Sequence, residues 1–254
     1  MSEILLSAKD VCKSFANNGE QNHILNHVSF DLYQGDFTVI MGASGAGKST
    51  LLYSISGMDS ITAGEIFYKG KKISGCGEKE ISRLRTEEFG FVFQQIHLVS
   101  NLTLMENVTV PGFMNKKKNA GEVKERALQL LEKVNVLHAK DRLSAQVSGG
   151  EAQRAAIARA VIAEPGLLFA DEPTGALNRK NTEDVLDLMT EMNREGQSIL
   201  MVTHDVRAAL RADRLLYLED GKIVGGEMKL PPYTPEEARN RETQINAWLA
   251  SMEW

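Results

Sequence analysis

The chain has 254 residues, of which 43% are hydrophobic and 25% charged, and its formal net charge at pH 7 is −5. This composition indicates a folded globular protein and argues against a disordered or low-complexity chain. The acidic balance gives no general reason to bind nucleic acid, and we interpret the basic run from Lys116 to Lys118 as a solvated loop.

The cysteines and the lack of long apolar stretches limit the cellular setting. Cys12 and Cys76 lie far apart and form no CxxC pattern, which argues against a disulfide framework and against a zinc site. No stretch approaches ~18 uninterrupted apolar residues, and the N-terminus lacks a basic leader. We therefore expect a cytoplasmic protein, with any membrane-spanning part belonging to another chain.

The first part of the chain, residues 4–36, alternates in the manner of β-strands. Stretches that favour β structure, such as 28–33, are interrupted by turn residues at 17–19 and 34–36. This pattern predicts an antiparallel β layer that leads into a buried strand at 37–41.

A glycine-rich run, GASGAGKST at residues 42–50, follows this strand and precedes an apolar helical stretch. Glycines let the backbone curl so that successive N–H groups point at phosphate oxygens, and the following helix offers its positive N-terminal end to the same anion. Lys48 is expected to reach the β- and γ-phosphates of the ligand, and the Ser49 hydroxyl to ligate Mg²⁺. The run is therefore predicted to be a P-loop, with the nucleotide-binding residues Gly42, Ser44, Gly45, Gly47, Lys48, Ser49 and Thr50.

Buried-strand runs recur at 90–93, 167–170 and 199–202 and are separated by helical patterns. This arrangement indicates a parallel α/β sheet. Between residues 96 and 160 no strand-like run stands out, and 122–134 is amphipathic, so we expect an inserted, mostly helical lobe.

Further local signals predict one helix and one hairpin. The apolar residues from Val185 to Met192 recur at helical spacing, with Asn181 or Thr182 as the N-cap and Gly196 as the stop. The dipeptide Asp220-Gly221 lies between two apolar runs, which is typical of a β-hairpin turn.

Two further motifs lie at the ends of predicted elements: an acidic pair that ends a strand, and a glycine-containing run at the start of a helix. Asp171 and Glu172 end the strand at 167–170, where Asp171 is expected to hold Mg²⁺ and Glu172 to orient and deprotonate the attacking water. The run from Val147 to Arg154 precedes the predicted alanine-rich helix at 155–163 and provides a second glycine-bearing helix N-terminus, again suited to bind an anion. One nucleotide cannot easily contact two such sites from different lobes of one subunit, so the pattern hints at a two-subunit sandwich.

Taken together, the P-loop, Ser148-Gly149-Gly150, the pair Asp171-Glu172 and Thr203-His204-Asp205 resemble the ATP-binding subunit of an ABC transporter. The resemblance implies an α/β fold: a P-loop NTPase core with an N-terminal antiparallel β layer and an inserted helical lobe. It also implies an ATPase that forms a head-to-tail homodimer, in which each ATP lies between the P-loop of one subunit and Ser148, Gly149 and Gly150 of the other.

The resemblance assigns roles to further residues. Phe15 is expected to stack on adenine, and His204 to contact the γ-phosphate. Gln94, rather than the alternative Gln95, is expected to touch Mg²⁺ and to sense the membrane partner. The implied catalytic residues are thus Glu172, His204 and Gln94, and the implied metal ligands are Ser49, Gln94 and Asp171.

Two positions depart from the family pattern. The segment Ser148-Gly149-Gly150 resembles the signature motif of the family, and Glu151 stands where many such signatures have Gln. The resemblance allows this variation, because Ser148 and the glycine amides make the phosphate contacts. Asn178 stands where Asp is common in a loop that crosses the dimer interface. The loss of a negative charge there is expected to affect coupling between the two sites.

The motifs at 90–94, 101–108 and 170–175 look like those of one branch of the ABC family. This branch contains macrolide exporters, lipoprotein-release ATPases and antimicrobial-peptide resistance pumps. The resemblance implies a peripheral protein on the inner face of the membrane, partnered by a permease with a large extracytoplasmic domain. The alternative is a division-type relative that regulates cell-wall hydrolases without moving a substrate. A DNA-repair or translation ATPase would need a coiled-coil insertion or a tandem cassette, and neither is visible.

The resemblance covers about residues 4–226, so we assign 1–226 to the nucleotide-binding domain, with its lobe at about 96–160, and 227–254 to a tail. Residues 236–254 are predicted to form a helix that packs on its own domain. A partner or dimer contact is the alternative, and a membrane-surface helix is less favoured because its polar face is not strongly basic. The apolar face consists of Ile245, Trp248, Leu249 and Met252.

Overall fold

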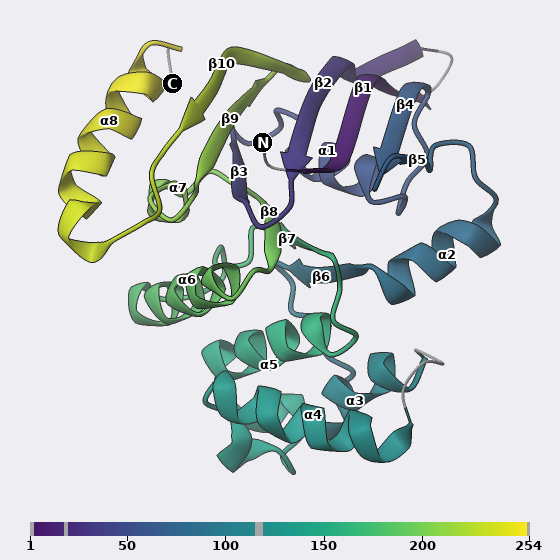
Figure 1. Ribbon diagram of the computed structural model, residues 1–254, viewed down its shortest axis with the longest axis vertical. Helices are drawn as coiled ribbons and strands as arrows, with labels where there is room; N and C mark the ends of the chain where they lie inside the picture. Colours follow the sequence, from purple (N-terminus) through teal and green to yellow (C-terminus); the bar gives the residue numbers. More distant parts are fainter. Residues whose placement is uncertain (1–2, 18–19, 115–118, 253–254) are drawn as a thin grey trace. The chain divides into compact units, whose positions relative to one another are not determined.

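The computed structural model describes residues 3–17, 20–114 and 119–252. These residues divide into two compact units, the first made of the chain up to Ile81 and from Asn193 onward, the second of 82–192 (Figure 1). The basic run from Lys116 to Lys118 lies outside the described residues, so its interpretation as a solvated loop stays a prediction. No helix in the described part of the chain is long and apolar enough to cross a membrane.

The N-terminal β layer of unit 1 is a four-stranded antiparallel sheet. β1 (Ile4–Asn17) pairs with β2 (Glu20–Tyr33) on one side and with β4 (Ala63–Tyr68) on the other, and β5 (Lys71–Lys72) follows β4 at the edge. The antiparallel layer predicted for the start of the chain is therefore confirmed.

The core of unit 1 is built around β3 (Phe37–Met41). This strand runs parallel to β8 (Ser198–Thr203) and to β9 (Arg214–Glu219), and every residue of β3 and β8 is buried. Near-continuous apolar strands of this kind are expected when both faces of a parallel sheet are covered. The predicted P-loop leads from β3 into α1 (Lys48–Ile55), and α7 (Val206–Ala209) follows β8.

The last two strands of unit 1 form a hairpin, in which β10 (Lys222–Lys229) pairs antiparallel with β9. Its turn residues Asp220 and Gly221 both have positive φ, +45° and +72°. A two-residue hairpin turn of this type needs φ above zero at both central positions, and Asp-Gly meets that need. The predicted hairpin is confirmed.

The C-terminal segment of unit 1 contains η3 (Pro235–Glu237) and α8 (Ala238–Ala250). Ile245 and Leu249 are buried, and so is Arg241, whose guanidinium donates hydrogen bonds to the carbonyl oxygens of Pro231 and Ala212. The helix therefore packs against its own unit, which favours that interpretation of the tail over a partner contact. The domain boundaries at 226 and 227 stay a prediction.

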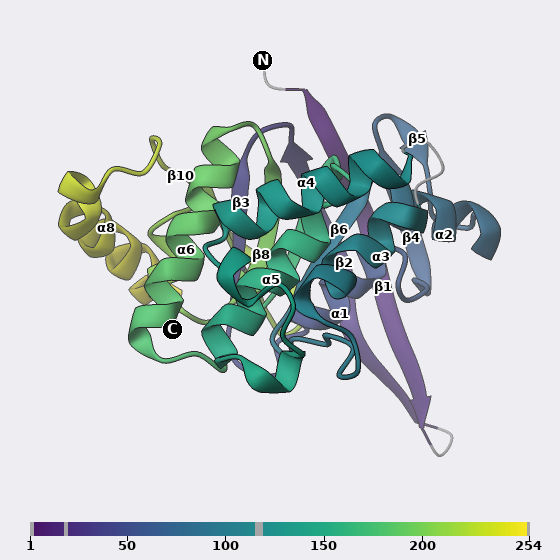
Figure 2. The same cartoon turned by 90° about the horizontal axis from the view of Figure 1, so that it is seen from below.

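In unit 2, β6 (Phe89–Phe93) and β7 (Leu167–Asp171) pair in parallel, and the rings of Phe91 and Phe169 stack with their centroids 5.4 Å apart. The helical elements between them in sequence are α3 (Leu104–Met114), α4 (Ala120–Lys133), η1 (Leu137–Ala139), η2 (Ser144–Gln146) and α5 (Gly149–Val161). Figure 2 shows α3, α4 and α5 packed side by side. The region predicted to be an inserted lobe is thus helical as expected, and α2 (Glu78–Glu87) precedes β6.

One helix boundary differs from the prediction. α6 (Arg179–Arg194) begins before Asn181 and Thr182, the two residues expected to cap it. The side chain of Asn178 accepts a hydrogen bond from the backbone N–H of Asn181 at 2.9 Å, so Asn178 is the residue that caps the helix. Asn178, Asn181 and Thr182 are all residue types that favour an N-cap, so the local sequence does not decide among them.

Candidate functional site

The glycine loop of unit 1 surrounds the side chain of Lys48. This lysine is 5% exposed, and its Nζ donates hydrogen bonds to the carbonyl oxygens of Gly42 and Ala43, both at 2.9 Å. Gly45 and Gly47 have φ of +87° and +99°, in the left-handed region that favours glycine. The loop thus bends back over the lysine and holds its charge next to the start of α1.

The start of α1 offers positive potential. In this fully described helix no side chain caps Gly47, and no acid occurs in the first turn. The N–H groups of a first helical turn lack partners within the helix, and the helix dipole adds positive potential there. Together with Lys48, this helix end forms an anion-binding site of the type that takes phosphate groups.

Close packing explains why the loop begins with glycine. A Cβ atom at Gly42 would lie 2.2 Å from the carbonyl oxygen of Leu218 in β9, a distance that no side chain tolerates. On the far side of the loop, the N–H of Gly221 donates to the carbonyl oxygen of Ala46 at 3.1 Å. The β9–β10 hairpin therefore supports the loop from behind.

His204 and the loop lie at the same edge of the sheet. The last residues of β3 and β8, Met41 and Thr203, are register partners in parallel strands, so the segments that follow them emerge together. His204 is exposed, and the next residue, Asp205, caps α7 and pairs with the Arg207 guanidinium at 2.8 Å. The structure thus brings His204, the residue expected to contact the γ-phosphate, and the P-loop to one edge of unit 1.

Phe15, the residue expected to stack on adenine, lies in unit 1 near the end of β1, opposite Asn22 of β2. Its side chain is not part of the core, because 46% of the residue is exposed. An exposed phenylalanine offers an aromatic surface on which a purine base can stack.

In unit 2 the residues that end β6 and β7 are brought together. Phe93 and Asp171 are register partners, so Gln94 and Glu172 follow at the same edge of this strand pair. Asp171 is buried, whereas Glu172 is half-buried and has φ of +44°, a left-handed backbone that is uncommon for glutamate. Such backbone positions often occur at functional sites.

Gln94 is packed against the loop that follows Glu172. A Cβ atom at Gly175 would lie 2.8 Å from Nε2 of Gln94, so glycine is needed where this side chain passes. The amide of Gln153 in α5 donates to the carbonyl oxygen of Phe93 at 3.2 Å. The helix that carries the signature is therefore tied to the strand end from which Gln94 emerges.

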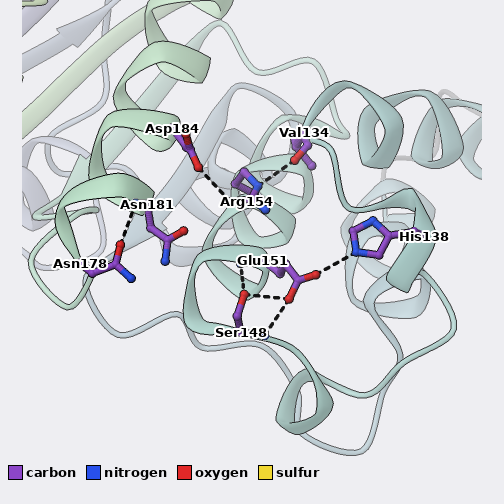
Figure 3. Close-up of polar contacts among 8 residues, drawn as sticks. All are labelled: Val134, His138, Ser148, Glu151, Arg154, Asn178, Asn181 and Asp184. Carbon is purple, nitrogen blue, oxygen red and sulfur yellow. Dashed lines mark hydrogen bonds and ion pairs between the residues drawn. The ribbon is translucent and has the colours of Figure 1, made fainter.

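Ser148 is the N-cap of α5 and forms a reciprocal capping box with Glu151 (Figure 3). The N–H of Glu151 donates to Ser148 Oγ at 3.2 Å, while Oε2 of Glu151 accepts from the Ser148 N–H at 2.8 Å and from its hydroxyl at 2.7 Å. The start of α5, predicted to be a second anion-binding helix end, is thus already capped by a carboxylate of the chain itself.

His138 completes this arrangement from outside the helix. Its Nε2 lies 2.9 Å from Oε1 of Glu151. The Ser148 N–H, then the Ser148 hydroxyl, then His138 lower the pKa of the Glu151 carboxyl from an ordinary 4.5 to about 2. Sequence reasoning missed His138, because its partner is 13 residues away and no motif includes it.

A second contact network joins α5 to α6, also drawn in Figure 3. A Cβ atom at Gly150 would lie 2.4 Å from Cγ of Asn181, so the side chain of Asn181 covers this signature glycine. Arg154 donates through Nε to the carbonyl oxygen of Val134 at 3.0 Å, and its NH1 lies 3.9 Å from Asp184. The signature helix is thus held between the capped start of α6 and the end of α4.

The predicted site residues therefore fall into two sets, one in each unit. Unit 1 holds Phe15, the P-loop and His204, and unit 2 holds Gln94, Ser148 to Gly150, Asp171 and Glu172. Across residues 3–17, 20–114 and 119–252, no group of three or more His, Cys, Asp or Glu side chains could hold a metal ion.

Comparison with known proteins agrees with this geometry. A family model described as ABC transporter matches residues 25–175. A dimeric structure of the ATP-binding cassette MJ0796 in a post-hydrolysis state, bound to ADP and Pi, is 34% identical with a TM-score of 0.83, and the match covers 90% of this chain and 100% of that one.

Two further structures are similar to this chain. A second dimeric structure of MJ0796, described as a bacterial ABC transporter cassette, is 35% identical with a TM-score of 0.83 and the same coverage, 90% and 100%. CbiO1 from Clostridium perfringens, part of the ABC transporter complex cbiONQ, is 27% identical with a TM-score of 0.80 over 96% of this chain and 94% of its own.

Proposed function

Because this chain belongs to the ABC transporter family, as one of its ATP-hydrolysing cassettes, we propose that it works as a homodimer that powers a separate membrane permease. The predicted α/β fold of an ABC ATPase and the predicted ATPase activity are confirmed by the family match and by the cassette structures. The observation that carries the proposed mechanism is the Lys48 ammonium held by the loop carbonyls at an uncapped helix start.

In this proposal the P-loop binds the phosphates of ATP. Lys48 and the N–H groups at the start of α1 neutralise the β- and γ-phosphates, and His204 contacts the γ-phosphate. Phe15 provides the stacking surface for adenine. Glu172 orients the attacking water and accepts its proton, which needs a carboxylate held at a fixed place at the end of β7.

Magnesium would be held by the Ser49 hydroxyl, the Gln94 amide oxygen and the Asp171 carboxylate. These are oxygen donors, the type that Mg²⁺ prefers, and the small number of carboxylates suits an ion that also binds substrate phosphates. When bound, the ion neutralises charge that develops on the phosphates. The chain's own residues position the nucleotide and the water.

The dimer is proposed to place the signature residues of one copy against the P-loop of the other. The solved structures of MJ0796 are dimeric, one of them with ADP and Pi bound. Ser148 and Gly149 at the start of α5 are exposed here, as residues that meet a second copy must be.

The permease contact is proposed to lie on the helical region after Gln94. Val110, Phe113 and Met114 on α3 are large apolar residues, each between 45% and 64% exposed, and they recur at helical spacing. Exposed apolar residues gathered on one helix face are typical of protein contacts. Docking through this surface would keep the chain on the cytoplasmic face of the membrane.

We further propose that the permease has a large extracytoplasmic domain and that the complex serves export or resistance to peptides, antibiotics or lipoproteins. This proposal is supported by the similarity of residues 90–94 and 170–175 to the motifs of the ABC branch that contains macrolide exporters, lipoprotein-release ATPases and antimicrobial-peptide resistance pumps. A regulatory role without transport is the second candidate, and it uses the same motifs. Identification of the co-purifying membrane protein, followed by a transport assay on the reconstituted complex, separates the two.

The dimer and the base are tested together with Glu172→Gln. This variant keeps the shape of the side chain but removes the proton acceptor, so hydrolysis should fall steeply while ATP binding persists. It should then accumulate as an ATP-dependent dimer in size-exclusion chromatography with light scattering. Ser148→Arg, added to Glu172→Gln, should abolish that dimer. A Glu172→Gln protein that remains monomeric with ATP bound, or hydrolyses ATP normally, refutes the proposal.

A further inference from the structure

Lys13 and Phe15 form a pair with an unusual distribution of exposure. The ammonium of Lys13 lies 4.7 Å from the centroid of the Phe15 ring, within the range of a cation–π contact. The charged side chain is only 7% exposed, whereas the aromatic residue is 46% exposed. A soluble protein usually does the opposite, because burial of a charge costs free energy and burial of a ring gains it.

The buried ammonium is fixed by two further contacts. Lys13 Nζ donates to Oδ1 of Asp59 at 2.7 Å and to the carbonyl oxygen of Ser60 at 2.6 Å. Since a charge-assisted hydrogen bond is stronger and shorter than a neutral one, these contacts hold the lysine in one place. The lysine therefore gives the Phe15 ring a fixed support on one face.

The same segment connects to the helix that begins at the P-loop. The N–H groups of Met58 and Asp59 both donate to the carbonyl oxygen of Tyr53 in α1, at 2.9 and 3.0 Å. The N–H of Ser14 donates to the hydroxyl of Thr62 at 2.9 Å, next to Lys13 in β1. The end of β1 and the end of α1 are thus tied together within unit 1.

We propose that Lys13 is a positioning residue for the base of ATP, which holds the Phe15 ring in place relative to α1. This inference rests on the proposed function, in which Phe15 stacks on adenine and the start of α1 binds the phosphates. A ring fixed before the nucleotide arrives loses less conformational freedom on binding. Lys13 acts through Phe15 and touches neither the phosphates nor the attacking water.

The experiment compares MgATP with inorganic tripolyphosphate, which carries the phosphates without the base. Lys13→Met should weaken the binding of MgATP by about 2- to 30-fold, the range of a cation–π contact, and leave tripolyphosphate binding unchanged. In steady-state assays KM should rise by the same factor while kcat at saturating ATP stays near that of the wild type. Lys13→Arg should bind MgATP with an affinity close to that of the wild type, because a guanidinium can also pair with Asp59 and lie over an aromatic ring.

A matched control lies on the same strand. Lys9 Nζ lies 4.9 Å from the centroid of the Phe67 ring, so Lys9→Met removes a comparable contact away from Phe15. It should not change the affinity for MgATP. Asp59→Asn keeps the Lys13 charge but weakens its anchor, and should cause a smaller loss than Lys13→Met.

The outcomes separate this inference from the proposed function. If Phe15→Leu leaves ATP affinity unchanged, the assignment of the base site is wrong. If Phe15→Leu weakens ATP binding but Lys13→Met does not, or if Lys13→Met weakens tripolyphosphate binding equally, the positioning role is overturned. In the double variant, Lys13→Met should add little to the loss of ATP affinity caused by Phe15→Leu, because Lys13 acts only through the Phe15 ring.

Discussion

Nε2 of His138 lies 2.9 Å from Oε1 of Glu151, so the residue that departs from the common signature is held from two sides. Ser148 binds one carboxylate oxygen and His138 lies at the other. The departure from Gln to Glu therefore has a structural consequence. It places a fixed negative charge at the start of the helix that is proposed to meet the second copy.

The stability of the protein should depend on the ionisation of Glu151 in acid. The folded state lowers the pKa of this carboxyl from 4.5 to about 2, so its contribution is fully present above pH 4.5 and is lost as the pH falls toward 2. Glu151→Gln should therefore flatten the fall in the free energy of unfolding over that window, measured by urea titration at several pH values.

Glu106 provides the matched comparison for Glu151. It caps α3 through Thr103 in the same manner, and these hydrogen bonds lower the pKa of its carboxyl. Glu106 is more exposed than Glu151, so Glu106→Gln should change the acid profile less. Equal profiles for the wild type and Glu151→Gln would contradict the proposed stabilising role of the capping carboxylate.

Asn178 should act as a helix cap in which Asp is an acceptable substitute. Asn178→Ala removes the acceptor for the Asn181 N–H and should lower the free energy of unfolding by about 1 kcal/mol. Asn178→Asp keeps the acceptor and adds a charge that the helix dipole favours, so stability should be equal or higher. Urea titration measures both, and equal losses for Ala and Asp would show that capping is not the role of this side chain.

Local patterns predicted most elements of the fold, and contacts between distant residues account for what they missed. The buried strand β3, the turn at Asp220-Gly221 and the P-loop each carry their signal within a few residues. The predicted N-cap of α6 was wrong because Asn178 and Asn181 are the same residue type, and the local sequence does not show which of them begins the helix. Lys13 and Phe15 are close in sequence, but the Asp59 anchor that fixes them is 46 residues away and has no pattern.

The C-terminal helix should contribute to the stability of unit 1. Ile245 and Leu249 are 0% and 1% exposed, so deletion of residues 236–254 should uncover apolar surface and lower the melting temperature. Leu249→Ala should lower stability by about 2–5 kcal/mol. Glu242→Ala, an exposed position of the same helix, is the control. An unchanged melting temperature together with loss of complex formation would favour a partner contact instead.

The permease contact is best probed with Phe113. Charge reversal at Glu106 would remove the cap of α3, because its carboxylate accepts from the N–H and hydroxyl of Thr103. Phe113→Asp leaves the cap intact and changes a side chain that is 46% exposed, and should reduce co-purification with the permease while ATP binding persists. Glu106→Gln serves as the control for the fold of α3. Unchanged recovery of the permease with Phe113→Asp would place the contact elsewhere.

Lys48 is expected to decide whether nucleotide binds at all. Its ammonium is held at the start of α1 by the carbonyl oxygens of Gly42 and Ala43, at the place proposed for the β- and γ-phosphates. Lys48→Ala removes this charge and should abolish ATP binding or hydrolysis, and with them the rise in melting temperature that MgATP gives the wild type. Lys124→Ala, an exposed lysine of α4, should keep both the activity and the ATP-induced rise. Wild-type turnover in Lys48→Ala would reject the P-loop assignment, because no other cation of that loop could replace the lost charge.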